Sequence, residues 1–220
     1  MLVVYVVVIF FGVLTLYNHQ TVETFSMPVS KKVILIDAGH GGWDPGSKVG
    51  GADALEKDIN LAIARKLQVH LEQGGSYVLL TRAEDEALSE RKSADMAARR
   101  DLANHGRADM IISIHQNSFT SERVAGTQVF YYTGSQLGKH LAESVQEAIV
   151  SFTEQPRNLG IKANDQYYIL RTTTIPAILI ECGFLSNPAE RRLLMTEEYQ
   201  EKIAWAIYKG ILNFYETVGG

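Results

Sequence analysis

Three ionisable side chains each follow an apolar run that has the composition of a buried strand. His40 follows residues 33–36 within a glycine-rich stretch, His115 closes the run in MIISIHQNS, and Glu181 closes the run in AILIECGF. Strands more often end in turn-forming Gly, Asn, Asp or Ser, so three such residues at three strand ends are unexpected. Two histidines and carboxylates that converge on one edge are the ligand types of a catalytic zinc site, which keeps one position open for water.

The third protein ligand of such a site stays open on spacing alone. The candidates lie on the segment that leads from the first strand into the next helix, and they are Asp44, Asp53, Glu56 and Asp58. Glu56 has a second interpretation, because the Asp-x-x-Glu spacing from residue 53 is that of a capping box at a helix N-terminus. Capping and metal ligation carry equal weight for Glu56 on these grounds.

Each of these residues also has a simpler structural explanation. The stretch GHGG after a strand is compatible with a phosphate loop, but no Gly-Lys-Ser/Thr follows and Asp44 stands where GxGxxG requires Gly. His115 fits a buried histidine with satisfied nitrogens, although its neighbours are polar. Glu181 would be costly to bury without a partner, and a metal or a catalytic role supplies that partner. Cys182 is interpreted as a small packing residue, since no spare histidine is assigned to activate it.

The elements that position these residues alternate between strand and helix. Apolar runs predict strands at 33–36, 77–80, 110–114, 128–132, 168–170 and 177–180. Helical periodicity predicts helices at 55–71, 89–105, 136–152 and 198–214. Asn187, Pro188 and Glu190 predict the start of one more helix, with Asn as the N-cap. Residues 153–166 are polar and predict a long loop.

This alternation predicts the fold class. Strands that alternate with helices form βαβ units, so we expect a single α/β domain with a twisted, mostly parallel sheet of about six strands and helices on both faces. Ligands of open α/β sheets bind beyond the carboxyl ends of the strands. His40, His115 and Glu181 are expected at that edge.

Composition and charge limit the classes of partner. The chain has 220 residues and a net charge of -4, and its Lys and Arg are scattered among Asp and Glu. A nucleic-acid partner would need a basic face, so none is expected. The single cysteine excludes an internal disulfide and the structural zinc patterns that use several cysteines.

The N-terminus differs from the rest of the chain. Residues 1–22 contain no Asp, Glu, Lys or Arg, and residues 2–16 are almost wholly apolar. We predict a signal peptide or membrane anchor at 1–22, with an uncleaved anchor slightly favoured, then a linker at 23–31 and a catalytic domain at 32–217. The anchor would place the protein at a membrane.

Four motifs in order resemble a known family. They are DAGHGGWDPG, LEKDINL, SIHQNS and ECGFLSN, and they resemble the zinc-dependent N-acetylmuramoyl-L-alanine amidases of bacterial cell-wall turnover. The resemblance runs from Val33 to the last predicted helix and implies an α/β domain, zinc as cofactor and peptidoglycan as partner. One departure is Ala38, where the family commonly has proline, at a position that carries no ligand.

The resemblance also implies roles for individual residues. By position, the zinc ligands fall on His40, Glu56 and His115, and the catalytic glutamate falls on Glu181. This favours the metal role for Glu56. Asn117 lies where the family has a polar residue close to the metal, which implies contact with substrate.

Two further expectations concern the residues around His40. We predict that the glycines beside His40 let the backbone turn sharply and leave room beside a metal for water and substrate. Asp37 is a candidate to orient a metal ligand by accepting its hydrogen bond.

The branch of the family is indicated by the apolar N-terminus, the single catalytic domain and the stretch YQEKIAWAIYKGILNFY. These are most similar to the germination-specific amidases of endospore formers. That similarity implies cleavage between N-acetylmuramic acid and L-alanine in spore-cortex peptidoglycan, so that muramic δ-lactam forms. It implies an extracytoplasmic location in the cell wall or forespore envelope, secreted or membrane-anchored. The alternatives are a zinc metallopeptidase that cuts within the stem peptide and a non-catalytic wall-binding protein. The need for an accessory protein and the oligomeric state stay open.

Overall fold

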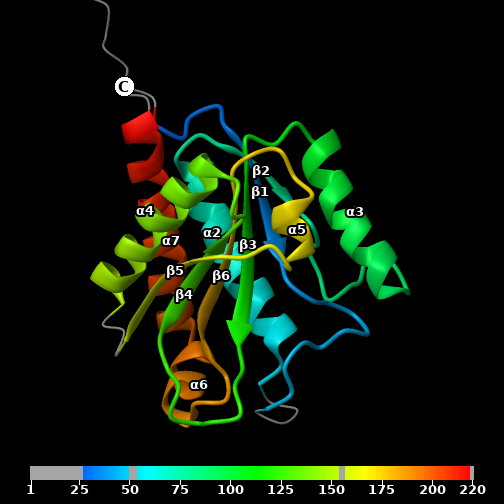
Figure 1. Ribbon diagram of the computed structural model, residues 1–220, viewed down its shortest axis with the longest axis vertical. Helices are drawn as coiled ribbons and strands as arrows, with labels where there is room; N and C mark the ends of the chain where they lie inside the picture. Colours follow the sequence, from blue (N-terminus) through cyan, green and yellow to red (C-terminus); the bar gives the residue numbers. More distant parts are fainter. Residues whose placement is uncertain (1–26, 50–53, 154–156, 219–220) are drawn as a thin grey trace, which may run out of the picture.

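The computed structural model describes residues 27–49, 54–153 and 157–218 (Figure 1). The strands of this part of the chain are β1 (Val33–Ala38), β2 (Tyr77–Leu80), β3 (Met110–Asn117), β4 (Thr127–Tyr131), β5 (Asn158–Ala163) and β6 (Ala177–Phe184). The helices are α2 (Glu56–Gln73), α3 (Lys92–His105), α4 (Gln136–Phe152), α5 (Tyr168–Arg171), α6 (Pro188–Leu194) and α7 (Glu197–Val218).

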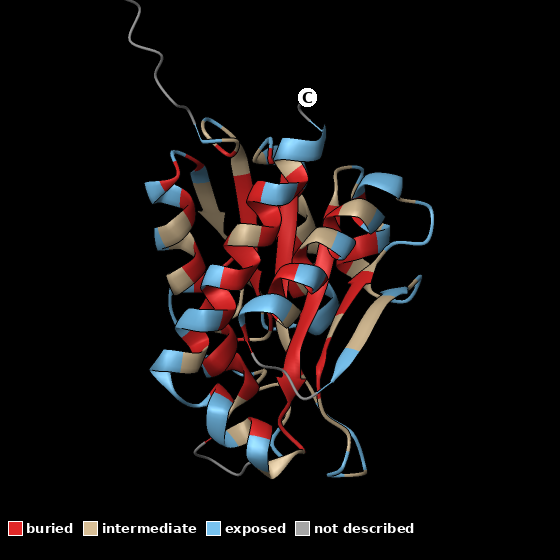
Figure 2. Ribbon diagram, turned by 90° about the vertical axis from the view of Figure 1, so that its left-hand side faces the viewer, coloured by how far each residue is buried: buried red, intermediate tan, exposed pale blue. Residues whose placement is uncertain are grey.

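The strands form one sheet with the order β2-β1-β3-β6-β4-β5. All neighbouring pairs are parallel except β4 and β6, which are antiparallel. Strands β1, β3 and β6 occupy the centre, and their continuous apolar runs suit strands that are covered on both faces (Figure 2). The predicted α/β class, the mostly parallel sheet and the number of strands are confirmed.

Helices cover both faces of the sheet, as predicted. Helices α2, α4 and α7 pack on one face, which Figure 1 shows at the left, and α3 and α5 cover the other. Side chains alternate between the faces along a strand, and Leu35, Ile111 and Leu179 belong to the core beneath α3 and α5. His115 lies four residues after Ile111 on β3, and Glu181 lies two residues after Leu179 on β6. Both side chains therefore point to the face that α3 and α5 cover.

Because β4 runs antiparallel to β6, the connection from β3 to β4 stays at the carboxyl edge of the parallel strands β1, β3 and β6. Strand β3 ends at that edge and β4 begins there, so residues 118–126 run across the end of β6, at the bottom of Figure 1. The segment is tied at both ends. The Phe119 amide donates to Ser186 Oγ at 3.0 Å, and the Gly126 amide donates to Glu190 Oε1 at 2.9 Å.

Two local predictions are wrong. Residues 168–170 belong to helix α5 rather than to a strand, and the predicted loop at 153–166 contains strand β5. A helix of four residues is too short to show periodicity. Strand β5 lies at the edge of the sheet and only half of its side chains are partly buried, so its sequence lacks a strong apolar pattern.

The predicted signal peptide or anchor at 1–22 lies outside the described residues. The described end of the predicted linker is packed on the domain, because Val29 is fully buried and its carbonyl accepts a 2.9 Å hydrogen bond from Ser76 Oγ. Within residues 27–49, 54–153 and 157–218, no helix has the length and apolarity needed to cross a membrane.

Candidate functional site

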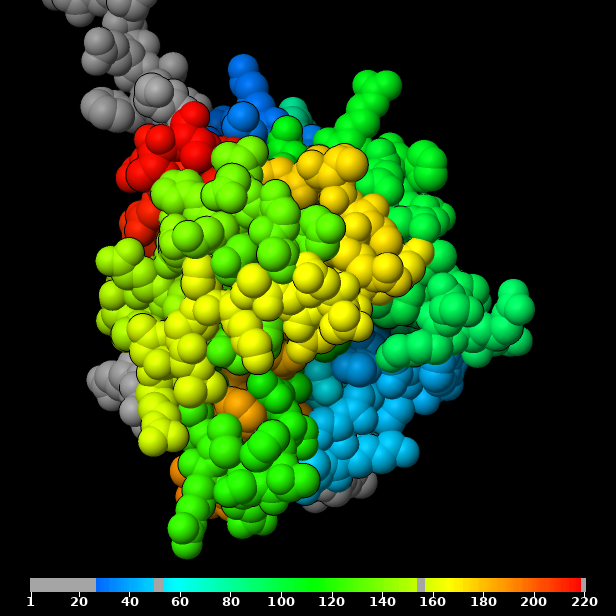
Figure 3. Space-filling view, in the orientation of Figure 1, coloured from blue at the N-terminus to red at the C-terminus, as the bar shows by residue number. Residues whose placement is uncertain are grey.

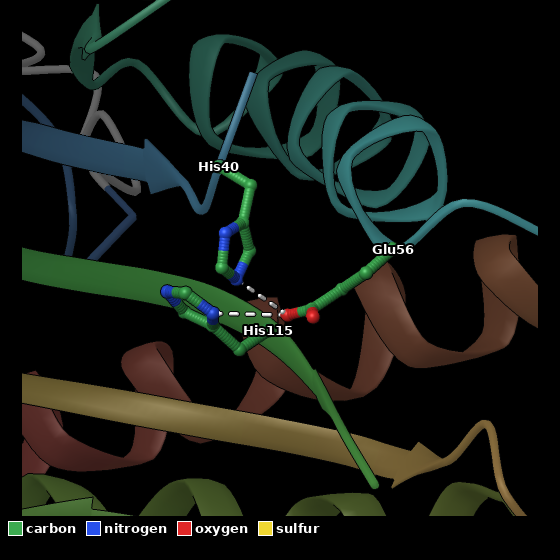
Figure 4. A group of neighbouring side chains, drawn as sticks. All are labelled: His40, Glu56 and His115. Atoms are coloured by element: carbon green, nitrogen blue, oxygen red, sulfur yellow. Dashed lines mark hydrogen bonds and ion pairs between the residues drawn. The ribbon is translucent and has the colours of Figure 1, made fainter. Parts of the chain in front are cut away.

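Three side chains from separate segments meet at the carboxyl edge of the sheet (Figure 4). His40 lies in the loop after β1, Glu56 is the first residue of α2, and His115 lies in β3. His40 Nε2 is 3.2 Å and His115 Nδ1 is 3.0 Å from the same oxygen, Glu56 Oε1. One nitrogen or oxygen from each residue lies within 4.8 Å of the other two, which is close enough for all three to hold one metal ion.

The Glu56 carboxylate is buried, and each of its oxygens accepts a hydrogen bond from a backbone amide. Its Oε2 accepts from the Ser47 amide at 2.8 Å, and its Oε1 accepts from the Gln116 amide at 3.1 Å. Burial opposes ionisation, but hydrogen bonds from His115 and His40 outweigh it and hold the pKa of Glu56 well below its usual value. The capping-box interpretation is wrong, because Leu55 is the N-cap of α2 and Glu56 bonds other segments instead of its own helix end.

Asp44 fixes the orientation of the His40 ring. The Asp44 carboxylate lies 2.9 Å from His40 Nδ1 and also pairs with Lys92, so that His40 Nε2 faces Glu56. Partial burial opposes ionisation, yet the bonds from Lys92 and His40 lower the pKa of Asp44 to about 2. Asp44 thus contacts His40, one member of the cluster, and is not itself one of the three residues grouped to hold a metal. Supporting carboxylates have this place in metal sites. Asp58 is exposed, and Asp53 lies outside the described residues.

Two glycines near His40, Gly39 and Gly46, make room for the cluster's own side chains. A Cβ atom on Gly39 would lie 2.3 Å from the His115 ring, and one on Gly46 would lie 2.5 Å from Glu56 Oε2. Both distances are shorter than contacting atoms allow, so any larger residue would displace one of the cluster's side chains.

Two buried arginines hold the loop that carries His40. Arg82 donates to the carbonyls of Ala38 and Gly39 at 2.9 and 3.1 Å. Arg99 donates to the carbonyls of Ala38 and His40 at 2.9 and 2.7 Å. The loop needs this support because His40 has a φ of 63°, in the left-handed region that side chains rarely adopt.

These arginines were not predicted from the sequence. Asp95, Arg99 and Ala103 are spaced four residues apart and are buried on one face of α3. That spacing is the signal that an arginine faces the interior. No comparable signal marks Arg82, which follows the short strand β2.

Asp37 supports the arginine rather than a metal ligand. Its carboxylate accepts hydrogen bonds from Arg99 at 2.7 Å, Ser113 at 2.6 Å and Thr81 at 3.0 Å. Burial alone would raise the pKa of Asp37, but the charges of Arg99 and His115 and the hydrogen bonds from Ser113 and Arg99 together outweigh it and lower the pKa to about 2. The expectation that Asp37 orients a histidine is wrong, since all of its side-chain partners lie elsewhere.

The variant Asp37→Asn is expected to unfold more easily at neutral pH, by about 3–5 kcal/mol, because it leaves Arg99 buried with one partner fewer. The folded-state pKa of Asp37 lies below its ordinary value of 3.8, so the unfolded state binds more protons as the pH falls. The stabilisation is complete above about pH 4 and is lost as the pH falls towards 2. Urea unfolding at several pH values should show wild type and variant converging in acid, and equal stability at pH 7 would contradict the prediction.

Glu181 lies next to the cluster on the neighbouring strand. It pairs with His115 in the parallel register of β3 and β6, so both side chains point to the same face. Glu181 is 7% exposed, and its Oε2 is buried with no hydrogen-bond partner among the residues that the structure describes. Burial, with the charge of Glu56 added, raises the pKa of Glu181 to about 7 against the opposing charge of His115.

A pocket of about 430 Å³ joins the cluster and Glu181 to the surface. Figure 3 shows this face hollowed where the loop after β1, the segment after β3 and α5 meet. The segment 118–126 contributes Ser118, and α5 with the residue before it contributes Tyr167, Tyr168 and Ile169. Asn117 also lines the pocket, and its Oδ1 accepts from the Ser118 amide at 2.8 Å.

The donor set fits a zinc ion. Two imidazole nitrogens and one carboxylate oxygen are the ligands of a catalytic zinc site with three protein ligands. In this structure the three donors bond one another instead, with both histidines on Glu56. An unpaired carboxylate oxygen at the same pocket adds a proton acceptor to the set.

Known proteins share this arrangement of sequence and fold. The sequence model described as N-acetylmuramoyl-L-alanine amidase matches residues 34–213. The germination-specific N-acetylmuramoyl-L-alanine amidase of Bacillus subtilis is 37% identical over 215 residues, which cover 92% of this chain and 87% of the relative.

Solved structures agree with the sequence comparison. The CwlD amidase of Clostridioides difficile, in complex with the GerS lipoprotein, has a TM-score of 0.81 and 40% identity over 85% of this chain and 100% of that one. The catalytic domain of the amidase CwlV from Bacillus (Paenibacillus) polymyxa has a TM-score of 0.76 and 33% identity, covering 84% of this chain and 98% of that one.

Proposed function

Because the chain belongs to the N-acetylmuramoyl-L-alanine amidase family and is an amidase of peptidoglycan, we propose that it is a zinc enzyme whose metal is held by His40, Glu56 and His115. The observation that carries the proposal is the unpaired, buried Oε2 of Glu181 at the pocket that those three side chains line. A carboxylate left without a partner beside a metal-binding cluster has the arrangement of a general base.

The metal and Glu181 have separate tasks in the proposed mechanism. His40, Glu56 and His115 would hold a zinc ion, whose Lewis acidity would activate water and polarise the carbonyl of the scissile amide. Glu181 Oε2 accepts the proton of the attacking water and then delivers it to the nitrogen of L-alanine as the bond to the lactoyl carbonyl breaks. Burial raises the pKa of Glu181 above its ordinary value, which suits a group that first takes up a proton and then gives it away.

The pocket suits a polymeric substrate. It opens onto the surface, with the segment after β3 on one side and α5 on another. Asn117, which lines it beyond His115, is proposed to contact the substrate near the scissile bond. Asp44 keeps the His40 ring in place, while Arg82 and Arg99 keep its backbone in place.

The biological role is proposed from the relatives. Similarity to the germination-specific amidase supports action on spore-cortex peptidoglycan and formation of muramic δ-lactam. The similar CwlD amidase was solved with a lipoprotein, which supports an accessory protein for this chain. We propose an extracytoplasmic enzyme with a signal peptide or membrane anchor at 1–22, a linker from residue 23 and a catalytic domain at 32–217.

The test is mass spectrometry of purified spore-cortex peptidoglycan after digestion. Intact stem peptides with free N-terminal alanine are expected, and their release should stop after dialysis against a chelator and return when zinc is added. Fragments cut within the stem peptide would indicate a metallopeptidase instead. Binding without any cleavage, in the presence of zinc and a candidate accessory protein, would indicate a wall-binding protein.

A further inference from the structure

Tyr167 is the side-chain hydrogen-bond partner that the structure gives to Glu181. The phenol oxygen of Tyr167 lies 3.5 Å from Glu181 Oε1, while Oε2 has no partner among the described residues. The bond is long, as bonds between catalytic groups often are before substrate binds. The two oxygens of Glu181 are therefore distinguished, and one is kept away from the reaction.

Backbone hydrogen bonds and a contact between aromatic rings hold Tyr167 in place. Its amide donates to Asn164 Oδ1 at 3.0 Å, and its carbonyl accepts from the amides of Leu170 and Arg171 at 3.2 Å each. Its ring packs edge-on against Phe130 of β4, with 5.2 Å between ring centroids. Rotating the phenol away from Glu181 would break the contact with Phe130, so the hydroxyl is held at the carboxylate.

We propose that Tyr167 is a positioning residue, which holds Glu181 Oε1 so that Oε2 faces the water and the amide that react. The inference rests on the proposed function for the role of Glu181. Loss of the hydroxyl would let the carboxylate rotate and divide its time between productive and unproductive orientations, which lowers the rate of the chemical step.

The phenol acts as a donor only. Burial, together with the negative charge of Glu181, raises the pKa of Tyr167 to about 12, so the hydroxyl keeps its proton. Its hydrogen bond favours the ionised form of Glu181. The other charged or titratable groups that act on Glu181 are His115 on β3, Glu56 on α2 and His40 in the loop after β1. Tyr167 approaches Glu181 from a different element, as the N-cap of α5.

Two matched variants test the assignment. Tyr167→Phe removes the hydroxyl on Glu181, and Tyr215→Phe removes a buried hydroxyl on α7, which lies outside the pocket lining and has no hydrogen-bond partner among the described residues. We expect Tyr167→Phe to bind zinc normally, to keep KM within about twofold, and to lower kcat about tenfold. We also expect the acid limb of its pH profile to move up by about 0.5 pH units, while the acid limb and the kcat of Tyr215→Phe should coincide with those of the wild type.

A second measurement does not depend on activity. In zinc-loaded protein with 13C-labelled glutamate, the Glu181 carboxylate signal, assigned by its absence in Glu181→Gln, should titrate at higher pH in Tyr167→Phe than in the wild type. An unchanged titration, or an equal fall in kcat in both tyrosine variants, would overturn the positioning role. Absence of hydrolysis by the wild type would overturn the proposed function instead, and the titration would still decide whether Tyr167 holds Glu181.

Discussion

Replacing Glu181 by Gln is expected to lower kcat on peptidoglycan by about 10³-fold, because the amide cannot take the proton of the attacking water. The substitution keeps the size of the side chain and leaves His40, Glu56 and His115 in place. Zinc content by elemental analysis should therefore equal that of the wild type. The rate is measured as release of stem peptides with free N-terminal alanine.

The control for this variant is Glu190→Gln. Glu190 is also buried, and it accepts hydrogen bonds from the amides of Gly126 and Phe184 at 2.9 and 2.8 Å, away from the cluster. Glu190→Gln is expected to lower the free energy of unfolding and to leave kcat per folded molecule unchanged. If Glu181→Gln retained kcat within tenfold of the wild type, the assignment of the base would have to be abandoned.

The second large effect is expected for His115→Ala, which should lose bound zinc and fall to background activity. The variant removes one of three donors, and Glu56 loses its 3.0 Å contact with His115 Nδ1. Three protein ligands are the usual minimum of a catalytic zinc site. Zinc is measured by elemental analysis after gel filtration, and the fold by circular dichroism.

A matched histidine lies outside the site. His105 is at the end of α3, where its Nδ1 bonds the Asp101 carbonyl at 2.9 Å, and His105→Ala should keep both zinc and activity. Zinc bound at the wild-type level in His115→Ala would remove His115 from the proposed ligand set. Loss of zinc in both variants would point to a general effect on folding.

The sequence predicted the centre of the fold better than its margin. Helix α4 has the predicted bounds, and the apolar runs of β1, β3 and β6 indicated strands that are indeed buried. Burial on both faces demands apolar side chains throughout, and that demand is visible in the sequence. Strand β5 and helix α5 lie at the margin, where partial exposure and short length leave little pattern.

A similar contrast holds for the candidate site, where some residues were predicted from the sequence and others were missed. His40, Glu56, His115 and Glu181 were predicted as a set, and the structure brings them to one pocket. Ionisable residues at strand ends are conspicuous because they cost free energy unless paired. Residues that act on backbone atoms leave no such mark.

The supporting residues depend on contacts that only the folded chain reveals. Arg82 and Arg99 were missed because their acceptors are carbonyl oxygens, which any residue offers. Tyr167 was missed because it precedes an element whose type was itself predicted wrongly. Asp37 was predicted to orient a metal ligand and instead accepts a hydrogen bond from Arg99. Arg99 lies 62 residues further along the chain, so the sequence around Asp37 gives no sign of this partner.

The segment that crosses the end of β6 can change in length without disturbing the residues that carry the chemistry. Between its anchors at Phe119 and Gly126, residues 120 to 123 are mostly exposed, and one side-chain contact, from Asn187 Nδ2 to the Glu122 carbonyl at 2.8 Å, holds this stretch. A longer or shorter stretch here would leave the register of β3 and β4 unchanged. Insertions at this point would extend the rim of the pocket on the side of Ser118 and would leave His40, Glu56, His115 and Glu181 in place.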